Sequence, residues 1–322
     1  MTVENAAGAG AREDYRYPFE AYPTGWYLLV ESGELECGKV LPLRYFGRDI
    51  VLYRTESGKP VLVDAHCPHM GAHLGYGGKV CGENIRCPFH SWEFAPDGPC
   101  ASIPYRTTER IPEVGLKTWR IRETSGFIFA HYSPTREEPA WSVPDEPAWK
   151  EKGWIGYEKF SWRAKVHVQE VAENIPDTAH FVYVHDVPAL PKVRGKIDGH
   201  IYRQSMTNLV RGKEVKVLEH DAHGLGFSWI EAFIPVHYRM LVTATPIDAL
   251  YTDLRIYFLV HEGEGAETLS QLSRDTIDLV IENTSRDVRI WEHKAYVERP
   301  PLVQGDGPIG VLRRWSRQFY SA

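Results

Sequence analysis

The chain has 322 residues, 43% of them hydrophobic, and a formal net charge of −6 at pH 7. This length suits two domains that each bury a core of their own. Because the balance is slightly acidic and no basic run occurs, nucleic acid is not an expected partner. No apolar stretch approaches the roughly 18 residues of a membrane-spanning helix, so no integral membrane segment is expected.

The chain begins with MTVENAAGAGARED, which has neither a positively charged start nor an apolar core. A secretory signal needs both. The sequence therefore predicts a disordered leader over residues 1–22 and a cytoplasmic location.

From Trp26 to about Tyr132, short β runs alternate with Gly and Pro turns, and no helical period occurs. This pattern predicts a small all-β domain over residues 23–135. Its most informative feature is a pair of motifs, Cys67-Pro68-His69 and Cys87-Pro88-Phe89-His90. In a Rieske [2Fe–2S] cluster, two thiolates hold one iron and two imidazoles hold the other. We therefore predict cluster ligands at Cys67, His69, Cys87 and His90.

The same four side chains could instead close a tetrahedral zinc site. A proline after each cysteine rigidifies both loops, glycines crowd the stretch between them, and β runs flank them at 50–53 and 61–63. These features favour the cluster. Respiratory Rieske proteins carry a further cysteine in each loop, where this chain has Gly71-Ala72 and Phe89. We therefore expect a low-potential cluster, with the remaining cysteines as free thiols in a reducing compartment: Cys37, Cys81 and Cys100.

Prolines, tryptophans and charges between Ser133 and Gly153 predict an interdomain linker, which we place at residues 136–155. The second domain is then expected over residues 156–322. Strand-like residues 159–168 lead into a helical segment near Glu170. Later runs predict strands at 225–235, 238–246 and 254–260, and a long helix from 266 to 296 that closes the chain.

The chemistry of the second domain centres on the string ENIPDTAH, residues 173–180, followed by His185. Two histidines near acidic side chains indicate a mononuclear metal site of the kind used by non-haem Fe(II) oxygenases. Each residue also has a structural interpretation, since a histidine can simply be packed and Asp177 can cap a helix. On a straight helix His180 and His185 would lie about 140° apart. We therefore expect a distortion or two short helices here, with Pro176 as the break.

A third ligand is expected from the final helix. Apolar residues there recur at spacings of three and four and form one stripe: Ile277, Val280, Ile281, Val288 and Trp291. Asp287 falls within this stripe, whereas Asp275, Asp278 and Glu282 project to the opposite side. A carboxylate on an apolar face is costly unless it is paired or binds a metal. Asp287 is therefore the best candidate, with a core ion pair as the alternative.

The combination of CPH…CPFH with ENIPDTAHFVYVH resembles the oxygenase component of Rieske non-haem iron oxygenases over nearly the whole chain. The likeness is greatest to the group of 3-ketosteroid 9α-hydroxylases and cholesterol 7-desaturases, and it extends through residues 287–294 and 306–320. It implies that His180, His185 and Asp287 bind the catalytic iron and that Asn174 lies near it. It also implies an α+β architecture, in which an all-β Rieske domain precedes a helix-grip (START-like) catalytic domain with an antiparallel sheet round a long helix.

Asp177 matches the bridging aspartate of that family. The resemblance implies a head-to-tail homotrimer in which Asp177 joins His90 of one chain to His180 of the next. Each subunit would hold one [2Fe–2S] cluster and one mononuclear Fe(II). Electrons would come from NAD(P)H through a separate flavin and iron–sulfur reductase, with or without a ferredoxin, and O2 would be the co-substrate.

The resemblance implies hydroxylation (monooxygenation) of a bulky hydrophobic polycyclic substrate, with steroids among the candidates. A desaturase, demethylase or dihydroxylase acting on a non-steroid substrate is the alternative within the family. Outside it stand a Rieske electron-transfer protein without oxygenase activity and a helix-grip lipid-binding protein. The chain ends soon after Tyr320, where steroid hydroxylases of the group usually continue, so the substrate stays open. Four aromatic residues predict either an apolar pocket or ordinary sheet core: Phe227, Trp229, Phe233 and Tyr238.

Overall fold

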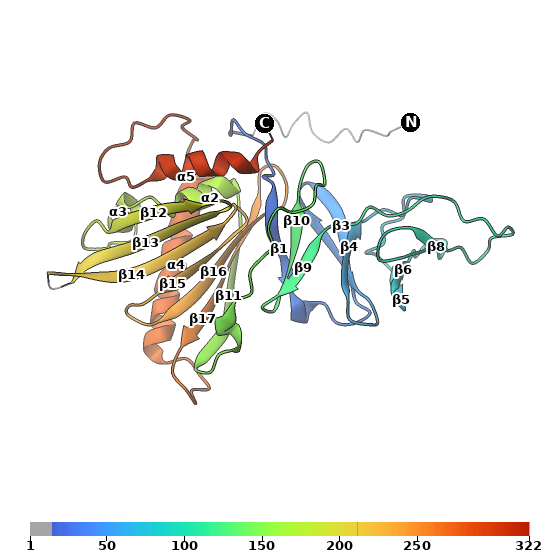
Figure 1. Ribbon diagram of the computed structural model, residues 1–322, viewed down its shortest axis with the longest axis horizontal. Helices are drawn as coiled ribbons and strands as arrows, with labels where there is room; N and C mark the ends of the chain where they lie inside the picture. Colours follow the sequence, from blue (N-terminus) through green and yellow to red (C-terminus); the bar gives the residue numbers. More distant parts are fainter. Residues whose placement is uncertain (1–14, 211, 322) are drawn as a thin grey trace. The chain divides into compact units, whose positions relative to one another are not determined.

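The computed structural model describes residues 15–210 and 212–321. It divides into two compact units, one formed by residues 26–145 and the other by residues 15–25 together with 146–321. The mostly antiparallel sheets, with few helices, confirm the predicted α+β class (Figure 1). Among the described residues, no helix is long and apolar enough to cross a membrane.

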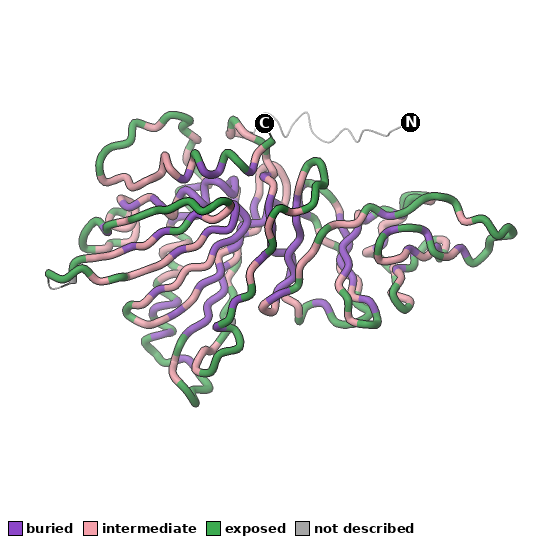
Figure 2. Tube along the Cα trace, viewed as in Figure 1, coloured by how far each residue is buried: buried purple, intermediate pink, exposed green. Residues whose placement is uncertain are grey.

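The unit of residues 26–145 contains three small antiparallel sheets, ordered β1-β10-β9, β2-β3-β4 and β5-β6-β7-β8. Strands β1 and β10 are buried almost from end to end (Figure 2), because both are short apolar runs bounded by turns. The strands span Gly25–Glu31 (β1), Val40–Tyr45 (β2), Arg48–Arg54 (β3), Pro60–Asp64 (β4), Lys79–Cys81 (β5), Asn84–Arg86 (β6), Glu93–Phe94 (β7), Cys100–Ser102 (β8), Ile121–Thr124 (β9) and Phe127–Tyr132 (β10).

The second unit is built on a seven-stranded sheet in the order β11-β17-β16-β15-β14-β13-β12, with every neighbouring pair antiparallel. The strands span Trp154–Ala164 (β11), Lys192–Asp198 (β12), Ile201–Val210 (β13), Lys213–His223 (β14), Phe227–Ala232 (β15), Tyr238–Pro246 (β16) and Thr252–His261 (β17). The helices span Val168–Glu173 (α2), Ala179–Tyr183 (α3), Gln271–His293 (α4) and Ile309–Ser316 (α5).

Helix α4 packs its apolar stripe on this sheet. Ile277, with Val280 and Ile281 beside it, contacts buried sheet residues that include Tyr238 and Phe258. The helix begins later than the predicted residue 266, because the Ser270 side chain accepts a hydrogen bond from the Ser273 amide and caps it there. A sheet gripping a long helix is the arrangement that the family resemblance implied.

Two features differ from the sequence predictions. The long helix does not close the chain, because α5 and a short 3₁₀ turn follow it. Strands β12, β13 and β14 were not predicted individually. Strand β12 lies at the sheet edge and is exposed along nearly its whole length, so it carries no alternation of apolar and polar residues to reveal it.

The segment before β1 packs on the second unit. The Arg16 guanidinium donates to the main-chain carbonyls of Glu292 (3.1 Å) and Trp291, and the Thr24 amide donates to the Phe319 carbonyl (2.7 Å). Residues 15–22 are therefore ordered, which corrects that part of the predicted leader. The rest of the leader, residues 1–14, lies outside the described residues.

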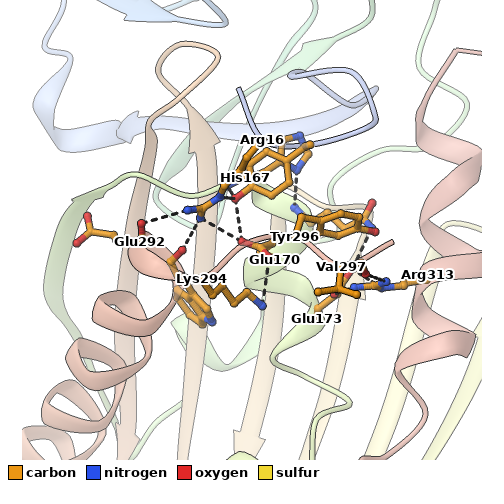
Figure 3. Close-up of polar contacts among 12 residues, drawn as sticks. Arg16, His167, Glu170, Glu173, Glu292, Lys294, Tyr296, Val297 and Arg313 are labelled. Carbon is orange, nitrogen blue, oxygen red and sulfur yellow. Dashed lines mark hydrogen bonds and ion pairs between the residues drawn. The ribbon is translucent and has the colours of Figure 1, made fainter. Parts of the chain in front are cut away.

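Helix α2 carries two buried carboxylates, which Figure 3 shows among their partners. Glu170 accepts a hydrogen bond from the Tyr17 hydroxyl (2.8 Å) and lies 3.2 Å from the Lys294 ammonium. Glu173 accepts two hydrogen bonds from the Arg313 guanidinium, from Nε to Oε1 at 2.9 Å and from Nη2 to Oε2 at 2.7 Å, which together form a bidentate ion pair. Segments far apart in sequence are thus tied to one short helix, because a buried carboxylate is costly without a cation.

Replacing Arg313 by Met leaves Glu173 buried without its cation. We expect the free energy of unfolding to fall by about 3–5 kcal/mol, the usual effect of breaking a buried ion pair. Denaturant unfolding measures this loss. Adding Glu173→Gln to the Arg313→Met variant should recover part of it, because a neutral amide is easier to bury than a carboxylate.

The matched control is Arg314→Met, since Arg314 is the neighbouring residue of α5 and is exposed. It should leave stability nearly unchanged. A loss below about 1 kcal/mol in Arg313→Met, the value of a surface pair, would contradict the structural role of this ion pair.

Candidate metal centres

Two loops of the first unit adopt the same backbone turn around Cys67 and Cys87. In both loops the cysteine amide donates to the carbonyl five residues on, and the cysteine carbonyl accepts from the amide four residues on. At the equivalent place in each turn, Gly71 and Ser91 have φ angles of +77° and +57°. The loops therefore present two cysteines and the histidines that follow them in matching frames.

The four predicted cluster ligands meet at these turns. The rings of His69 and His90 lie 4.7 Å apart, and Nδ1 of His69 is buried without a hydrogen-bond partner among the described residues. Both cysteine side chains are buried, and burial raises the pKa of the Cys67 thiol to about 11. Such a thiol becomes a thiolate when a metal ion displaces its proton. The donor set of two buried thiols and two imidazoles fits a [2Fe–2S] cluster.

The zinc alternative fits this geometry less well. One zinc ion would draw its ligand atoms to within about 4 Å of one another, given bonds of roughly 2.0–2.3 Å. Among the described residues, a trio of ligand atoms all within 4.8 Å of one another occurs in the other unit, at His180, His185 and Asp287. No such trio is found among the described side chains of the two loops.

Sequence reasoning missed two aromatic neighbours of the predicted cluster. The His69 ring stacks on the Trp92 indole, with ring centroids 4.3 Å apart and planes 8° apart. The indole N–H donates to the Tyr105 hydroxyl at 2.7 Å. The sequence signal for Trp92 is its place at the end of the second turn, whereas Tyr105 has no recognisable signal.

The second unit brings together His180, His185 and Asp287. Nε2 of His185 lies 3.0 Å from Oδ1 of Asp287, and the two imidazole rings are 4.8 Å apart. Asn174 joins them, because its amide donates to Oδ2 of Asp287 at 3.1 Å. Four of the predicted site residues thus occupy one place, although 113 positions separate Asn174 from Asp287 in the chain.

The expected break around Pro176 positions the two histidines. Helix α2 ends at Glu173 and α3 begins at Ala179, so residues 174–178 form a bend between them. His180 lies in the first turn of α3, and His185 lies beyond its end at Tyr183. His180 and His185 are therefore not on one straight helix, and the separation of about 140° expected for such a helix does not arise. On α4, Asp287 is only 5% exposed, whereas Asp275, Asp278 and Glu282 are exposed, as the periodicity predicted.

His180 supports a metal at this place. Both its ring nitrogens are buried without a hydrogen-bond partner among the described residues, since even the nearby Oδ1 of Asp177 lies 3.8 Å from Nδ1. This is a costly state for an imidazole unless a metal ion binds it. With His185 and Asp287 it forms the two-histidine, one-carboxylate set that suits non-haem Fe(II).

Asp177 lies beside this trio and is 34% exposed in its side chain. It accepts hydrogen bonds from the amides of Ala179 (3.1 Å) and His180 (3.3 Å), so it also acts as a helix cap. Burial tends to raise its pKa, but His180 and these amides together hold the pKa below its ordinary value. Asp177 is therefore ionised at neutral pH and can accept further hydrogen bonds.

A cavity of about 300 Å³ opens from the trio between the sheet and α4. Its lining includes His180, His185 and Asp287 together with mostly apolar residues of β13 to β16. Of the four aromatic residues considered as pocket lining, Phe227 and Tyr238 line it and Trp229 and Phe233 do not. Adjacent residues of a strand face opposite sides of the sheet, and periodicity alone did not show which side faces the cavity.

Comparison with known proteins agrees with this arrangement. Residues 25–120 match the Rieske [2Fe–2S] domain, and residues 130–320 match the 3-ketosteroid 9alpha-hydroxylase C-terminal domain. A cholesterol 7-desaturase of Bombyx mori is 31% identical over 328 residues, which cover 93% of this chain and 70% of that protein. A probable 3-ketosteroid-9-alpha-monooxygenase oxygenase component of Rhodococcus rhodochrous is 32% identical over 332 residues, covering 95% and 82%.

The fold also occurs in a solved structure, dicamba monooxygenase bound to dicamba. The two chains align with a TM-score of 0.70 at 16% sequence identity, over 94% of this chain and 98% of the other. The two domain matches in tandem, the relatives above 30% identity and the shared fold lead to one conclusion. The chain belongs to the Rieske non-haem iron oxygenases, in the group that holds 3-ketosteroid 9α-monooxygenase oxygenase components and cholesterol 7-desaturases.

Proposed function

We propose that this protein hydroxylates a bulky hydrophobic substrate, using O2 and electrons delivered by a separate reductase. The observation that carries the proposal is the trio of His180, His185 and Asp287, whose side chains are 9%, 10% and 6% exposed and which opens directly onto an apolar cavity. The overall reaction takes the substrate C–H bond, O2, two electrons and two protons to an alcohol and water. Iron held by the trio would supply the activation of O2.

The protein's own residues have defined tasks in this reaction. Asn174 donates to Oδ2 of Asp287 and so fixes the plane of the carboxylate, as outer partners of metal ligands do. The apolar cavity wall holds the substrate and keeps bulk water from it. In the other unit, the two turns at Cys67 and Cys87 would hold the cluster that receives electrons.

Electron delivery between subunits is part of the proposal. Met70 and Phe89, which adjoin the two cluster histidines, are 65% and 61% exposed. Exposed apolar side chains beside a redox site suit contact with another protein surface. In a head-to-tail trimer, the half-exposed Asp177 of one subunit would accept a hydrogen bond from His90 of its neighbour and orient the His180 ring beside it.

The same proposal covers partners and location. The Rhodococcus rhodochrous relative is named as an oxygenase component, which supports a separate reductase that draws electrons from NAD(P)H. None of the five cysteines, all of which lie among the described residues, forms a disulfide, which supports a reducing compartment such as the cytoplasm. Desaturation is the second candidate, because the Bombyx mori relative is a cholesterol 7-desaturase.

Iron analysis and isotope labelling test the function. We expect about three irons per chain, two from the cluster and one from the trio, because the ligand sets are separate. With a surrogate reductase and a panel of neutral polycyclic substrates under ¹⁸O2, one labelled atom should enter the product. A product with a new double bond and no label would assign the desaturase instead. Two irons per chain and no substrate-dependent O2 uptake would indicate an electron carrier.

Replacing Asp177 by Asn tests the bridge. The neutral amide cannot attract two imidazole N–H groups as a carboxylate does, so product formation should fall about 10- to 100-fold. Iron content and chemical reduction of the cluster should stay unchanged. The matched control is Asp186→Asn, because Asp186 follows the same short helix but its side chain is 83% exposed. Full turnover in Asp177→Asn would remove the bridge from the proposal.

The segment that carries Asp177 is in contact with the tail, the name used here for residues 294–308 between α4 and α5. The Thr178 hydroxyl donates to the Gly305 carbonyl, and the Thr178 amide donates to the Asp306 carbonyl at 3.4 Å. Gly307 has a φ of +80°, and a Cβ there would collide with the Pro176 carbonyl oxygen. The tail can approach this segment only because residue 307 has no side chain.

Replacing Gly307 by Ala should push the bend of residues 176–178 away from the tail. We expect the mononuclear iron to fall clearly below one per chain, with the visible spectrum of the cluster unchanged, because the cluster lies in the other unit. Gly310→Ala is the control, since a Cβ there meets nothing nearer than the Arg314 side chain at 3.9 Å. Equal iron content in both variants would show that the tail does not support the site.

A further inference from the structure

One histidine in the cavity has no role in the chemistry described so far. His220 lies on β14, in register with Gln204 on β13 and Ile230 on β15. The row continues to Met240 on β16, and all four side chains line the cavity. Cross-strand partners point to the same face of a sheet. His220 is therefore a polar residue in the sheet wall of an otherwise mostly apolar chamber.

Its imidazole is buried but not satisfied. His220 is 3% exposed, and its Nε2 has no hydrogen-bond partner among the described residues. A buried polar atom without a partner is costly, and native structures keep few of them. Burial, together with the neighbouring His223, lowers the pKa of His220 to about 3. The ring is therefore neutral at physiological pH, and Nε2 can donate or accept one hydrogen bond according to tautomer.

The cavity favours an uncharged ligand. Its described lining includes no lysine or arginine, and its one carboxylate, Asp287, belongs to the metal trio. Away from the metal trio, an anionic substrate would therefore find no lysine or arginine in the described lining to pair with, and burying an unpaired charge is strongly unfavourable. Two more polar atoms without described partners, the side-chain oxygens of Asn208 and Asn283, also lie in this lining. The polar atoms present suit neutral hydrogen-bonding groups.

The position of His220 also relates it to the metal trio. Gln204, its cross-strand partner, donates to the Ile175 carbonyl at 2.6 Å. Ile175 follows Asn174 directly and lies in the bend that precedes His180. His220 and Gln204 are directly opposed across β14 and β13, and the Cβ atoms of such partners lie about 4.5–5.5 Å apart. Gln204 thus links the strand beside His220 to the bend of residues 174–178, so a ligand bound to Nε2 of His220 would have a defined position relative to that bend.

We infer that His220 selects and orients the substrate, by a hydrogen bond from Nε2 to a neutral oxygen group, a hydroxyl or a ketone, on an otherwise apolar polycyclic molecule. This inference rests on the proposed function, because it assumes that the cavity is the substrate site. His220 acts as a positioning residue, because its hydrogen bond would fix which end of the substrate lies against the sheet wall. A hydrocarbon of the same shape would leave Nε2 buried and unpaired.

The test measures binding to the iron-loaded protein, so that it does not depend on turnover. The probes share one ring skeleton: 5α-androstane, 5α-androstan-3-one and 5α-androstan-3β-ol. The wild-type protein should bind the ketone or the alcohol about 10- to 100-fold more tightly than the hydrocarbon, because a buried polar atom then gains its partner. In His220→Leu this preference should disappear, with affinity for the hydrocarbon unchanged or higher.

Two further variants separate a lost hydrogen bond from a changed cavity. His220→Gln places an amide near the position of Nε2 and should keep most of the preference. Met240→Leu changes an apolar residue of the same row and should alter the affinity for all three probes alike. If His220→Leu does not fold, the probe preference of the wild-type protein and of His220→Gln still decides the matter.

Equal binding of the three probes by the wild-type protein, binding of none of them, or a preference that survives in His220→Leu would overturn the inference. The proposed function is judged separately on the same samples, by about three irons per chain and by O2 uptake with the reductase. A protein that passes those two measurements but does not discriminate among the probes is an oxygenase whose substrate is selected by other residues.

Discussion

A carboxylate buried in an apolar wall must be given a positive or hydrogen-bonding partner, and the catalytic unit is arranged around this constraint at Asp287. The residue is 5% exposed on a helix face that otherwise packs against the sheet. Asn174 and His185 approach it from a distant part of the chain, one oxygen each. A cation at the trio would complete the compensation, so a metal ion bound there would contribute to stability as well as to chemistry.

The same constraint recurs behind the metal trio. Helix α2 is only six residues long, too short to be stable by itself, and it ends where the bend to His180 begins. Its buried Glu170 and Glu173 are matched by cations and a hydroxyl from the N-terminal segment, the tail and α5. Ion pairs thus stabilise a short helix that would not form by local propensity alone. Because Asn174 directly follows this helix, the ion pairs also help to position it.

Sequence alone predicted the features that follow from local pattern. The motif of Cys67 and His69 with Cys87 and His90 identified the cluster ligands as candidates, and the periodicity of α4 selected Asp287 as its buried carboxylate. The structure brings His180, His185 and Asp287 together as those patterns indicated. What the sequence did not reveal depends on contacts between distant segments. Arg313 beside Glu173 and Gly307 beside Pro176 carry no local signal, and the burial of His220 is decided by which side of β14 faces the cavity.

The catalytic unit is discontinuous in sequence, with residues 15–25 before the Rieske unit and residues 146–321 after it. During synthesis the stretch of residues 26–145 can collapse as soon as it leaves the ribosome, since its sheets pair only within it and domains fold as units. Arg16 and Tyr17 cannot form their hydrogen bonds at that stage, because their partners Glu170, Trp291 and Glu292 have not yet been synthesised. The discontinuous unit is therefore completed after residues 26–145, by a segment, residues 15–25, that was synthesised before them.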